Sequence, residues 1–262
     1  MGSATRSALE AARGALSSAK EVDQATGEQL LEAARTIAGS PQLLAALMST
    51  SSGDTGTVEL VGAVFGSLAS TSRSLLEGIA TSRWSSSDDL LAGVEEIGIR
   101  AIAATAPRDG SLERELFEFG RVATSEPELE LALSSKRGGA DGKRVLVDSL
   151  LSSASPQARS IASHLVQQPR GRRISALVSE AVSIVADVSG KGVATVSVAR
   201  PLSPAQLSSV ESAITARYGR EHVVNQIVDP ALIGGVRIQV GDEVIDGSIA
   251  ARLADLSLQL AG

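Results

Sequence analysis

The chain has 262 residues, of which 43% are hydrophobic, so it is long enough to bury one large core or two ordinary ones. Its formal charge of -6 at pH 7 argues against a dedicated nucleic-acid surface. Without cysteine there is no disulfide framework or thiolate metal site, and no stretch approaches the roughly 20 apolar residues of a membrane span, so any membrane association is expected to be peripheral.

The first 190 residues have the pattern of amphipathic helices. Apolar residues recur at helical spacing within residues 6–20 and again within residues 28–38. Ser40 is placed to cap the next helix, and Pro41 stands at its first position, where a missing N–H costs nothing. With only five aromatic residues in the chain, the cores must consist mainly of Ala, Leu, Ile and Val, which suits closely packed helices.

This helical part repeats itself at an offset of 86 residues. The shift places "EQLLEAARTIAGSPQLLAAL" over "RELFEFGRVATSEPELELAL" without a gap, and it matches Pro41 with Pro127 and Arg35 with Arg121. We therefore predict a duplicated helical unit, in which a helix at about residues 88–105 closes the first copy and opens the second. The alternative is that Ala-rich amphipathic helices resemble one another by convergence.

The composition changes near residue 190. Ala194, Val196 and Val198 alternate with polar residues, which is typical of a strand with one buried face. Ser203 and Gln206 then form a capping box for a helix. Two strands are predicted at residues 222–228 and 236–240, followed by a two-residue turn, a return strand over "EVIDG" and a final helix. The predicted fold class is α+β, with helical units at 1–108 and 109–190 and a small α/β domain at 191–262.

The residue patterns that suggest chemistry are weak. Gly234 and Gly235 lead into a strand, whereas a phosphate site needs N–H groups at a helix N-terminus. "GGADGKR" is too short for a P-loop and lacks the following Ser or Thr. Asp242, Glu243 and Asp246 are a possible metal cluster, but hairpin and capping roles explain at least two of them. His164 and His222 stand in no catalytic motif, so packing or surface roles are expected.

Two further features have two interpretations each. Trp84 is either a partner anchor or a core residue. The arginines of "QQPRGRRISAL" either face an acidic partner or phosphate, or stand at a solvated helix start, which we favour; they are Arg170, Arg172 and Arg173.

The C-terminal stretch "IVDPALIGGVRIQVGDEVIDGSIAARL", together with "VARPLSPAQL" upstream, closely resembles the signature of the delta subunit of F-type ATP synthases, the family of the oligomycin-sensitivity-conferring protein. The family pattern is matched at Asp229, Pro230, Gly234, Gly235, Gly241, Asp242, Asp246, Gly247 and Ser248. "SRWSSSDDL" and "ELFEFGR" resemble the longer delta subunits of high-GC Gram-positive bacteria. Ordinary family members carry one helical copy, so the duplication departs from the common pattern.

This resemblance implies a stator subunit without catalytic residues or cofactor. It would be present in one copy per complex, on the cytoplasmic face of the bacterial plasma membrane. Its helical part would grip N-terminal helices of the alpha subunits, and its C-terminal part would hold the b-subunit stalk, with no nucleic acid and no membrane insertion. Expected head-binding residues are Leu9, Leu16, Leu75, Leu76 and Ile79, with Ile161 and Leu165 of the second copy as rivals. Expected stalk-binding residues are Leu253, Leu256 and Leu260.

Two other function classes are weighed against the stator. One is a nucleotide-dependent enzyme or regulator that uses the C-terminal α/β domain, and it predicts saturable binding of ATP and Mg²⁺ to the isolated chain. The other is a general helical adaptor, which is hard to reconcile with the C-terminal match.

Overall fold

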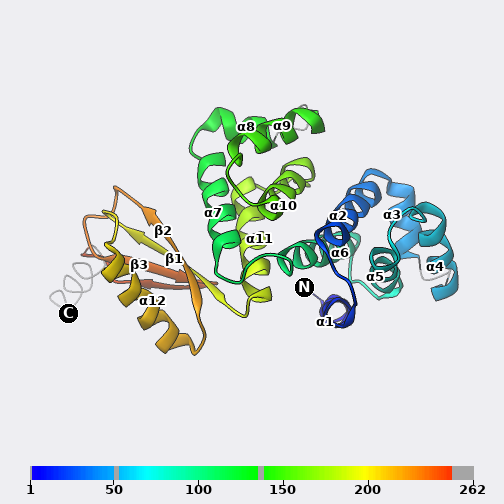
Figure 1. Ribbon diagram of the computed structural model, residues 1–262, viewed down its shortest axis with the longest axis horizontal. Helices are drawn as coiled ribbons and strands as arrows, with labels where there is room; N and C mark the ends of the chain where they lie inside the picture. Colours follow the sequence, from blue (N-terminus) through cyan, green and yellow to red (C-terminus); the bar gives the residue numbers. More distant parts are fainter. Residues whose placement is uncertain (1, 50–52, 135–138, 250–262) are drawn as a thin grey trace, which may run out of the picture.

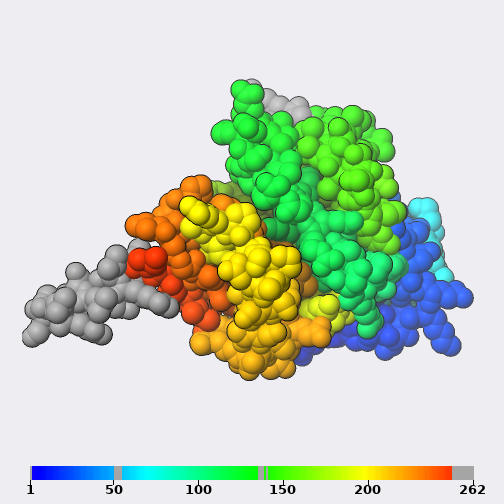
Figure 2. All heavy atoms as spheres, turned by 60° about the vertical axis from the view of Figure 1, so that its left-hand side comes forward, coloured from blue at the N-terminus to red at the C-terminus, as the bar shows by residue number. Residues whose placement is uncertain are grey.

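The structure is a computed structural model that describes residues 2–49, 53–134 and 139–249. In these ranges twelve α-helices precede or flank four β-strands, which confirms the α+β fold class. Figure 1 shows three parts in a row along the longest axis: a first helical unit, a second helical unit and an α/β region. In Figure 2 the α/β region lies against the second unit, and the first unit lies beyond it.

Eleven helices make up the two helical units. Those of the first unit are α1 (Ser3–Ser18), α2 (Gln24–Gly39), α3 (Pro41–Met48), α4 (Gly53–Val64), α5 (Ser70–Thr81) and α6 (Ser87–Ala103). Those that follow in the second unit are α7 (Ser111–Ala123), α8 (Pro127–Ser134), α9 (Ala140–Leu150), α10 (Pro156–Gln167) and α11 (Ile174–Val188).

The helix bounds repeat at the offset of 86 residues. Adding 86 to the bounds of α3 (41–48) gives 127–134, the bounds of α8, and adding 86 to α5 (70–81) gives 156–167, the bounds of α10. The other pairs, α2 with α7, α4 with α9 and α6 with α11, agree within two residues at each end. Ser40 caps α3 by accepting from Leu43 N–H at 3.3 Å, as predicted. The duplication is therefore present in the structure.

Helix α6 belongs to both units. Its residues Leu90, Val94 and Ile97 lie in the core of the first unit, whereas Ile99 and Ile102 lie in the core of the second. A single helix thus supplies two faces to two neighbouring cores, which confirms the shared helix predicted at about 88–105. The predicted domain limits at 108 and 190 fall in the links that follow α6 and α11. The division into domains at these points stays a prediction.

The α/β region contains β1 (Gly192–Val198), α12 (Pro204–Tyr218), β2 (His222–Val228), β3 (Val236–Val240) and β4 (Glu243–Asp246). The strand order is β2-β1-β3-β4, with β1 parallel to β2 and the other pairs antiparallel. Alternate residues of β1 are buried, as predicted, because α12 covers that face of the sheet. The capping box of Ser203 and Gln206 begins α12, and Gly219 ends it in the left-handed conformation.

Candidate partner-binding surfaces

The turn residues singled out in the sequence lie at the two ends of the sheet. Val198 of β1 pairs with Val228 of β2 and with Val236 of β3, so the loop after β2, the start of β3 and the end of β4 meet at one end. We call this the outer end of the sheet. Seven signature residues lie there: Asp229, Pro230, Gly234, Gly235, Asp246, Gly247 and Ser248. The other two, Gly241 and Asp242, form the predicted two-residue turn at the opposite end.

Two carboxylates at the outer end hold turns. Asp229 accepts a hydrogen bond from the N–H of Ala231 at 2.9 Å, and Asp246 accepts one from the N–H of Ser248 at 2.9 Å. The bond from Ser248 lowers the pKa of Asp246 below its usual value. Such side-chain turns replace a backbone turn. These acids therefore build the shape of the outer end.

The glycines of the outer end allow a close approach of two backbone segments. Gly235 has a φ of +86°, and a Cβ at this position would lie 2.5 Å from the carbonyl oxygen of Gly247. The segments are joined by two backbone hydrogen bonds, from Gly247 N–H to Val236 at 2.9 Å and from Ile249 N–H to Gly234 at 3.0 Å. The signature thus fixes the path of the chain from the end of β4 at Asp246 to Ile249.

The third acid near the signature also has structural partners. Glu243 accepts hydrogen bonds from Tyr218 Oη at 2.8 Å and from Arg217 Nη2 at 2.7 Å, and both lower its pKa. In the described ranges no three His, Cys, Asp or Glu side chains are grouped as metal ligands. Each of the three acids that the sequence singles out here thus has a structural role. Asp246 holds a turn, Glu243 forms an ion pair, and Asp242 stands in the hairpin turn.

The residues expected to bind the head are mostly core residues. Leu9, Leu75, Leu76 and Ile79 are buried in the core of the first unit, and Leu16 is half-buried at its edge. They do not form an exposed apolar stripe, because α1 and α5 pack on each other and on α6. The expectation that they form a free docking surface is corrected on this point. Contact with a partner stays a prediction. The partner would have to bind to exposed residues next to these buried ones.

The other expected residues have two outcomes. Ile161 and Leu165, the rivals in the second copy, are buried in the core of the second unit. Leu253, Leu256 and Leu260 lie outside the described residues, so their role in holding the stalk stays a prediction.

Several exposed apolar side chains were not singled out in the sequence. Leu131 on α8 is 70% exposed, Val145 on α9 is 63% exposed, and Ile233 near the outer end of the sheet is 77% exposed. Val58 and Val64 on α4 are also exposed. Leu131 follows Glu130 and precedes Ala132 in "PELELALS", so no local pattern in the sequence distinguishes it from the buried Leu133.

A buried ionic cluster joins the two units on one side of α6. Glu95 of α6 is buried and is paired with Arg170 and, at 3.2 Å, with Arg172. Arg172 reaches on to Glu180 of α11 at 2.7 Å. Arg170 and Arg172 are therefore paired within the chain and do not stand at a solvated helix start, whereas Arg173, exposed at the N-cap of α11, fits that interpretation. The charges of Arg170 and Arg172 neutralise a buried acid within the chain.

His164 of α10 completes this cluster. Its Nδ1 lies 3.0 Å from Arg35 Nη1 of α2, and its Nε2 lies 3.4 Å from Glu95 Oε1. Because the guanidinium of Arg35 only donates, Nδ1 accepts and the ring carries its proton on Nε2, facing Glu95. Burial lowers the pKa of His164, in spite of the raising effect of Glu95. In the packed protein His164 is thus a neutral link between α2, α6 and α10.

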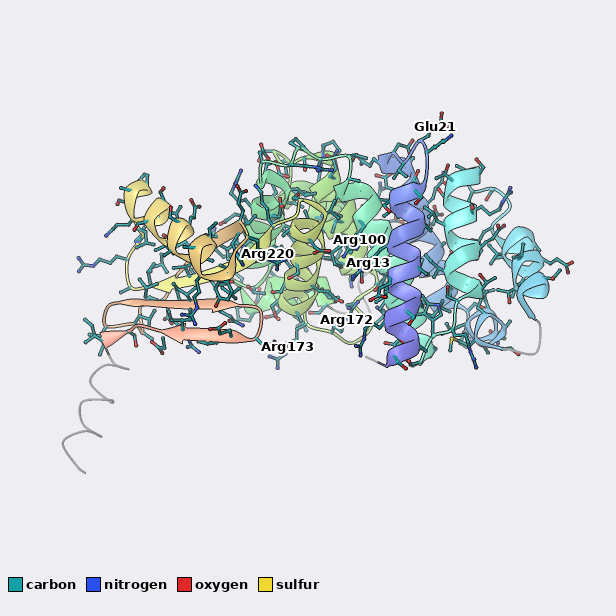
Figure 3. All side chains as sticks on the ribbon, turned by 90° about the horizontal axis from the view of Figure 1, so that it is seen from below. Arg13, Glu21, Arg100, Arg172, Arg173 and Arg220 are labelled. Carbon is teal, nitrogen blue, oxygen red and sulfur yellow. The ribbon has the colours of Figure 1, made fainter. Side chains whose placement is uncertain are left out.

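A second ionic cluster lies on another side of α6. Arg100 of α6 pairs with Glu96 at 2.7 Å and with Asp187 of α11 at 2.7 Å, and Glu96 also pairs with Arg13 of α1 at 2.6 Å. Figure 3 shows Arg13 and Arg100 close together between α1 and the second unit. Charged side chains of α6 therefore link α1 of the first unit to α11 of the second.

Trp84 belongs to the core of the first unit. Its indole N–H donates to the carbonyl oxygen of Ile79 at 2.8 Å, and its ring fills the space where a side chain at Gly93 would lie, 2.1 Å from the Cβ position. Of the two interpretations of Trp84, core burial is the one that fits.

Comparison with known proteins gives one consistent family. The model of the family "ATP synthase delta (OSCP) subunit" matches residues 100–260. The protein named ATP synthase subunit delta of Leifsonia xyli subsp. xyli is 45% identical over 264 residues, which cover 100% of both chains. The one of Streptomyces griseus subsp. griseus is 36% identical over 271 residues, again with 100% of both chains covered.

The matched regions bear on the duplication. The family match begins near the end of α6, so it includes the second unit and the α/β region, and the first unit lies outside it. The two relatives match the whole chain, so the first unit is included in both comparisons. No helix within the described residues is long and apolar enough to cross a bilayer. The chain belongs to the ATP synthase delta (OSCP) subunit family.

Proposed function

We propose that this chain is a non-catalytic peripheral-stalk subunit of the proton-translocating F-type ATP synthase. It joins the catalytic head of alpha and beta subunits to the b-subunit stalk and holds the head against rotary torque. The family match over residues 100–260, continued over the full chain by relatives named ATP synthase subunit delta, carries the proposal. As a subunit of this complex it would lie on the cytoplasmic face of the bacterial plasma membrane, peripherally and in one copy.

The packing of the two helical units suits a stator. They share α6, which contributes residues to the core of each unit. The clusters around Glu95 and Arg100 add links between α1, α2, α6, α10 and α11. A stator must transmit force between its two partners without bending, and a shared helix leaves no free linker between the units. Two grips on one rigid body also reinforce each other, because the first makes the second intramolecular.

We assign the head contact to the first unit, on the face that α1 and α5 share. In the second unit the corresponding face, between α6 and α10, is covered by α2, where Gln24 contacts Ser160 at 3.2 Å and Arg35 contacts His164 at 3.0 Å. In the first unit, the residues that lie 86 positions before Ser160 and His164 are Ser74 and Gly78 of α5, and both are exposed. Among the described residues, this face is therefore open to a partner helix in the first copy and covered in the second.

A blocking substitution tests this assignment. Nothing lies within 4 Å of a Cβ placed on Gly78 or on Gly39, at the exposed end of α2. Gly78→Trp should weaken binding of the chain to the purified catalytic head by at least about tenfold, and Gly39→Trp should bind as the unaltered chain does. Equal binding of both variants would move the head contact to another face. Failure of the unaltered chain to bind head or stalk would contradict the stator itself.

The enzyme alternative has its own test. Titration of the isolated chain with ATP and Mg²⁺ should show no saturable binding at micromolar concentration, and no hydrolysis. No geometric or family observation supports the alternative, because Gly234 and Gly235 precede β3 and no helix begins at them.

A further inference from the structure

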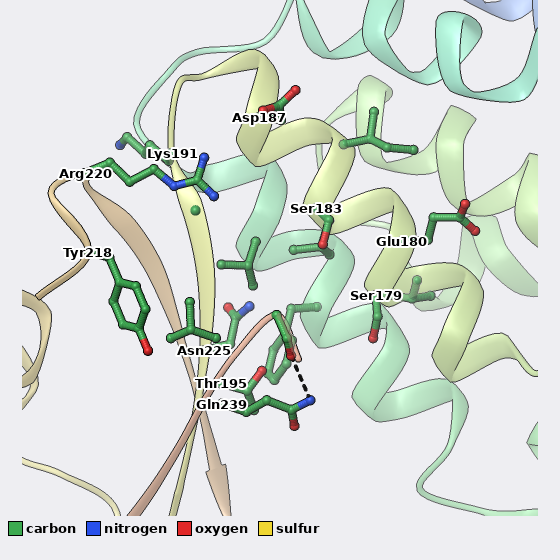
Figure 4. Close-up of a pocket in the computed structure, with 18 of the residues that line it drawn as sticks. Ser179, Glu180, Ser183, Asp187, Lys191, Thr195, Tyr218, Arg220, Asn225 and Gln239 are labelled. Atoms are coloured by element: carbon green, nitrogen blue, oxygen red, sulfur yellow. Dashed lines mark hydrogen bonds between the residues drawn. The ribbon is translucent and has the colours of Figure 1, made fainter. Parts of the chain in front are cut away.

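An open slot lies between the second helical unit and the α/β region. It has a volume of about 770 Å³ and runs between α11 and the sheet face that points away from α12 (Figure 4). Its size falls within the range of sites that hold ligands or partner side chains. The slot marks the place where the α/β region is joined to the helical arm.

The sheet side of the slot is one row of paired residues. Asn225 of β2 pairs with Thr195 of β1, which pairs with Gln239 of β3, which pairs with Val244 of β4. Directly paired residues point to the same face of a sheet. The helix side is formed in part by Ser179 and Ser183, one turn apart on α11 and both exposed, so hydroxyl and amide groups line both walls.

The acids that line the slot are already paired within the chain. Glu96 is bound by Arg13 and Arg100, Asp187 is bound by Arg100, and Glu180 is bound by Arg172. The remaining charge is therefore positive.

Two lining cations remain beside these pairs. Lys191 has only a long contact of 3.8 Å with the exposed Glu221. Within the described residues Arg220, at the mouth of the slot, has no ion pair or side-chain hydrogen bond (Figures 3 and 4). An anionic group of a partner can therefore bind here without displacing an internal pair.

The slot also contains an unpartnered buried donor. Asn225 is 3% exposed, and its Nδ2 has no hydrogen-bond partner. A buried amide left without a hydrogen-bond partner is unfavourable, and such groups in folded proteins are usually satisfied. A carbonyl or carboxylate oxygen seated in the slot would satisfy it.

We propose that this slot, between α11 and the Thr195–Asn225–Gln239 row, is a docking site for an acidic polypeptide segment of the b-subunit stalk. A carboxylate of the segment pairs with Arg220, and a carbonyl oxygen accepts from Asn225 Nδ2. This inference rests on the proposed function. It assigns a stalk contact to a surface other than the predicted final helix. Seated at the joint, the segment also stops the α/β region from bending against the helical arm.

Protection of a single thiol tests the occupancy of the slot. Because the chain has no cysteine, Ser183→Cys places one thiol in the slot, and Ser208→Cys places one on the exposed side of α12 as the matched control. Assembly into the whole ATP synthase should slow maleimide labelling at position 183 by at least about tenfold relative to the isolated chain, since a packed contact excludes water. Position 208 should label at the same rate in both. Equal labelling of position 183 in both states overturns the proposal.

A charge reversal tests the chemistry of the partner. Arg220→Glu should weaken binding of the purified soluble part of the b subunit by about tenfold. Arg144→Glu, at an exposed arginine of α9 that has no ion pair with any described residue, should leave this binding unchanged. Unchanged binding by Arg220→Glu overturns the acidic contact. Binding to the catalytic head is measured in parallel, so that loss of both contacts identifies a folding defect or a failed stator assignment.

Small anions provide the last arm of the test. Inorganic phosphate and ATP at millimolar concentration should not slow maleimide labelling of Ser183→Cys in the isolated chain. Saturable protection by either would identify the slot as a small-anion site and overturn the polypeptide proposal.

Discussion

The two helical units have the same series of helices but different surroundings. In the second unit, α2 of the first unit lies along α6 and touches α10, so that Ser160 is half-buried and His164 is buried. In the first unit no helix among the described residues covers the corresponding face, and Ser74 and Gly78 are exposed. The second unit is thus an inner repeat and the first unit is a terminal one.

This difference teaches what the duplication does. A tandem copy that shares a helix extends the arm, covers one face of the second unit, and presents the corresponding face of the first unit at the end of the arm. The residues that make the new junction, Glu95, His164 and Arg170, have no counterparts of the same chemistry 86 residues earlier, where Leu9, Gly78 and Trp84 stand. The junction is therefore specific to the pair of units, and the repeat alone does not supply it.

The largest loss of stability is expected from removing Glu95, the buried acid of the junction. Glu95→Ala leaves Arg170 and Arg172 without their shared partner, and breaking a buried ion pair in this way costs about 3–5 kcal/mol of unfolding free energy. Urea unfolding followed by circular dichroism measures the change. In the matched control, Glu118→Ala, the lost partner is the exposed Arg121, and the cost should stay below about 1 kcal/mol. Similar small costs in both variants would show that the cluster does not hold the units together.

Truncation at equivalent core positions compares the packing of the two units. Ile79 and Leu165 lie 86 residues apart, are 1% and 4% exposed, and belong to the first and second cores. Ile79→Ala and Leu165→Ala should each lower the unfolding free energy by about 3 kcal/mol, because each leaves a cavity. A negligible cost at Ile79 alone would mean that the first core is loose without a partner. That outcome would restore Ile79 as a docking residue.

The next largest effect on the free energy of unfolding is expected where α2 and α6 cross closely. A Cβ on Gly27 would lie 2.5 Å from the carbonyl oxygen of Gly98 and 2.5 Å from Ile102 Cγ1. Gly27→Ala should therefore destabilise the chain by about 2 kcal/mol in thermal or urea unfolding, since neither contact is free to yield. Gly14→Ala, on α1 with nothing within 4 Å, should stabilise it by about 0.5–1 kcal/mol. Stabilisation by both changes would indicate that the two helices are farther apart.

Local signals in the sequence were enough for several elements of the helical part and of the α/β region. Pro41 at a first helical position, the Ser203 and Gln206 capping box and the alternation of Ala194 to Val198 each depend on neighbours within a few residues. The fold class and the shared helix follow from such patterns and from the repeat.

The contacts between units could not be predicted in the same way. Glu95 and Arg170 are 75 residues apart and are not related by the repeat, so no local pattern connects them. An amphipathic stripe such as Leu75, Leu76 and Ile79 shows that one helix face is apolar, but the chain's own helices and a partner's helix cover such a face equally well. For this reason burial of the expected docking residues, and the slot beside Asn225, emerged only in three dimensions.

The smallest expected effect is a pH dependence confined to the inner repeat. Burial lowers the pKa of His164 from 6.5, and Arg35 and Arg170 lower it further against the opposing effect of Glu95. Below pH 6.5 His164 therefore binds a proton in the unfolded chain but not in the folded chain, so the free energy of unfolding falls as the pH falls. Between pH 6.5 and 5.5 the loss should be about 1 kcal/mol. His164→Gln should remove this slope, because Gln has no proton to gain. Unfolding curves at both pH values measure the slope, and an equal slope in the variant would place the titration at another group.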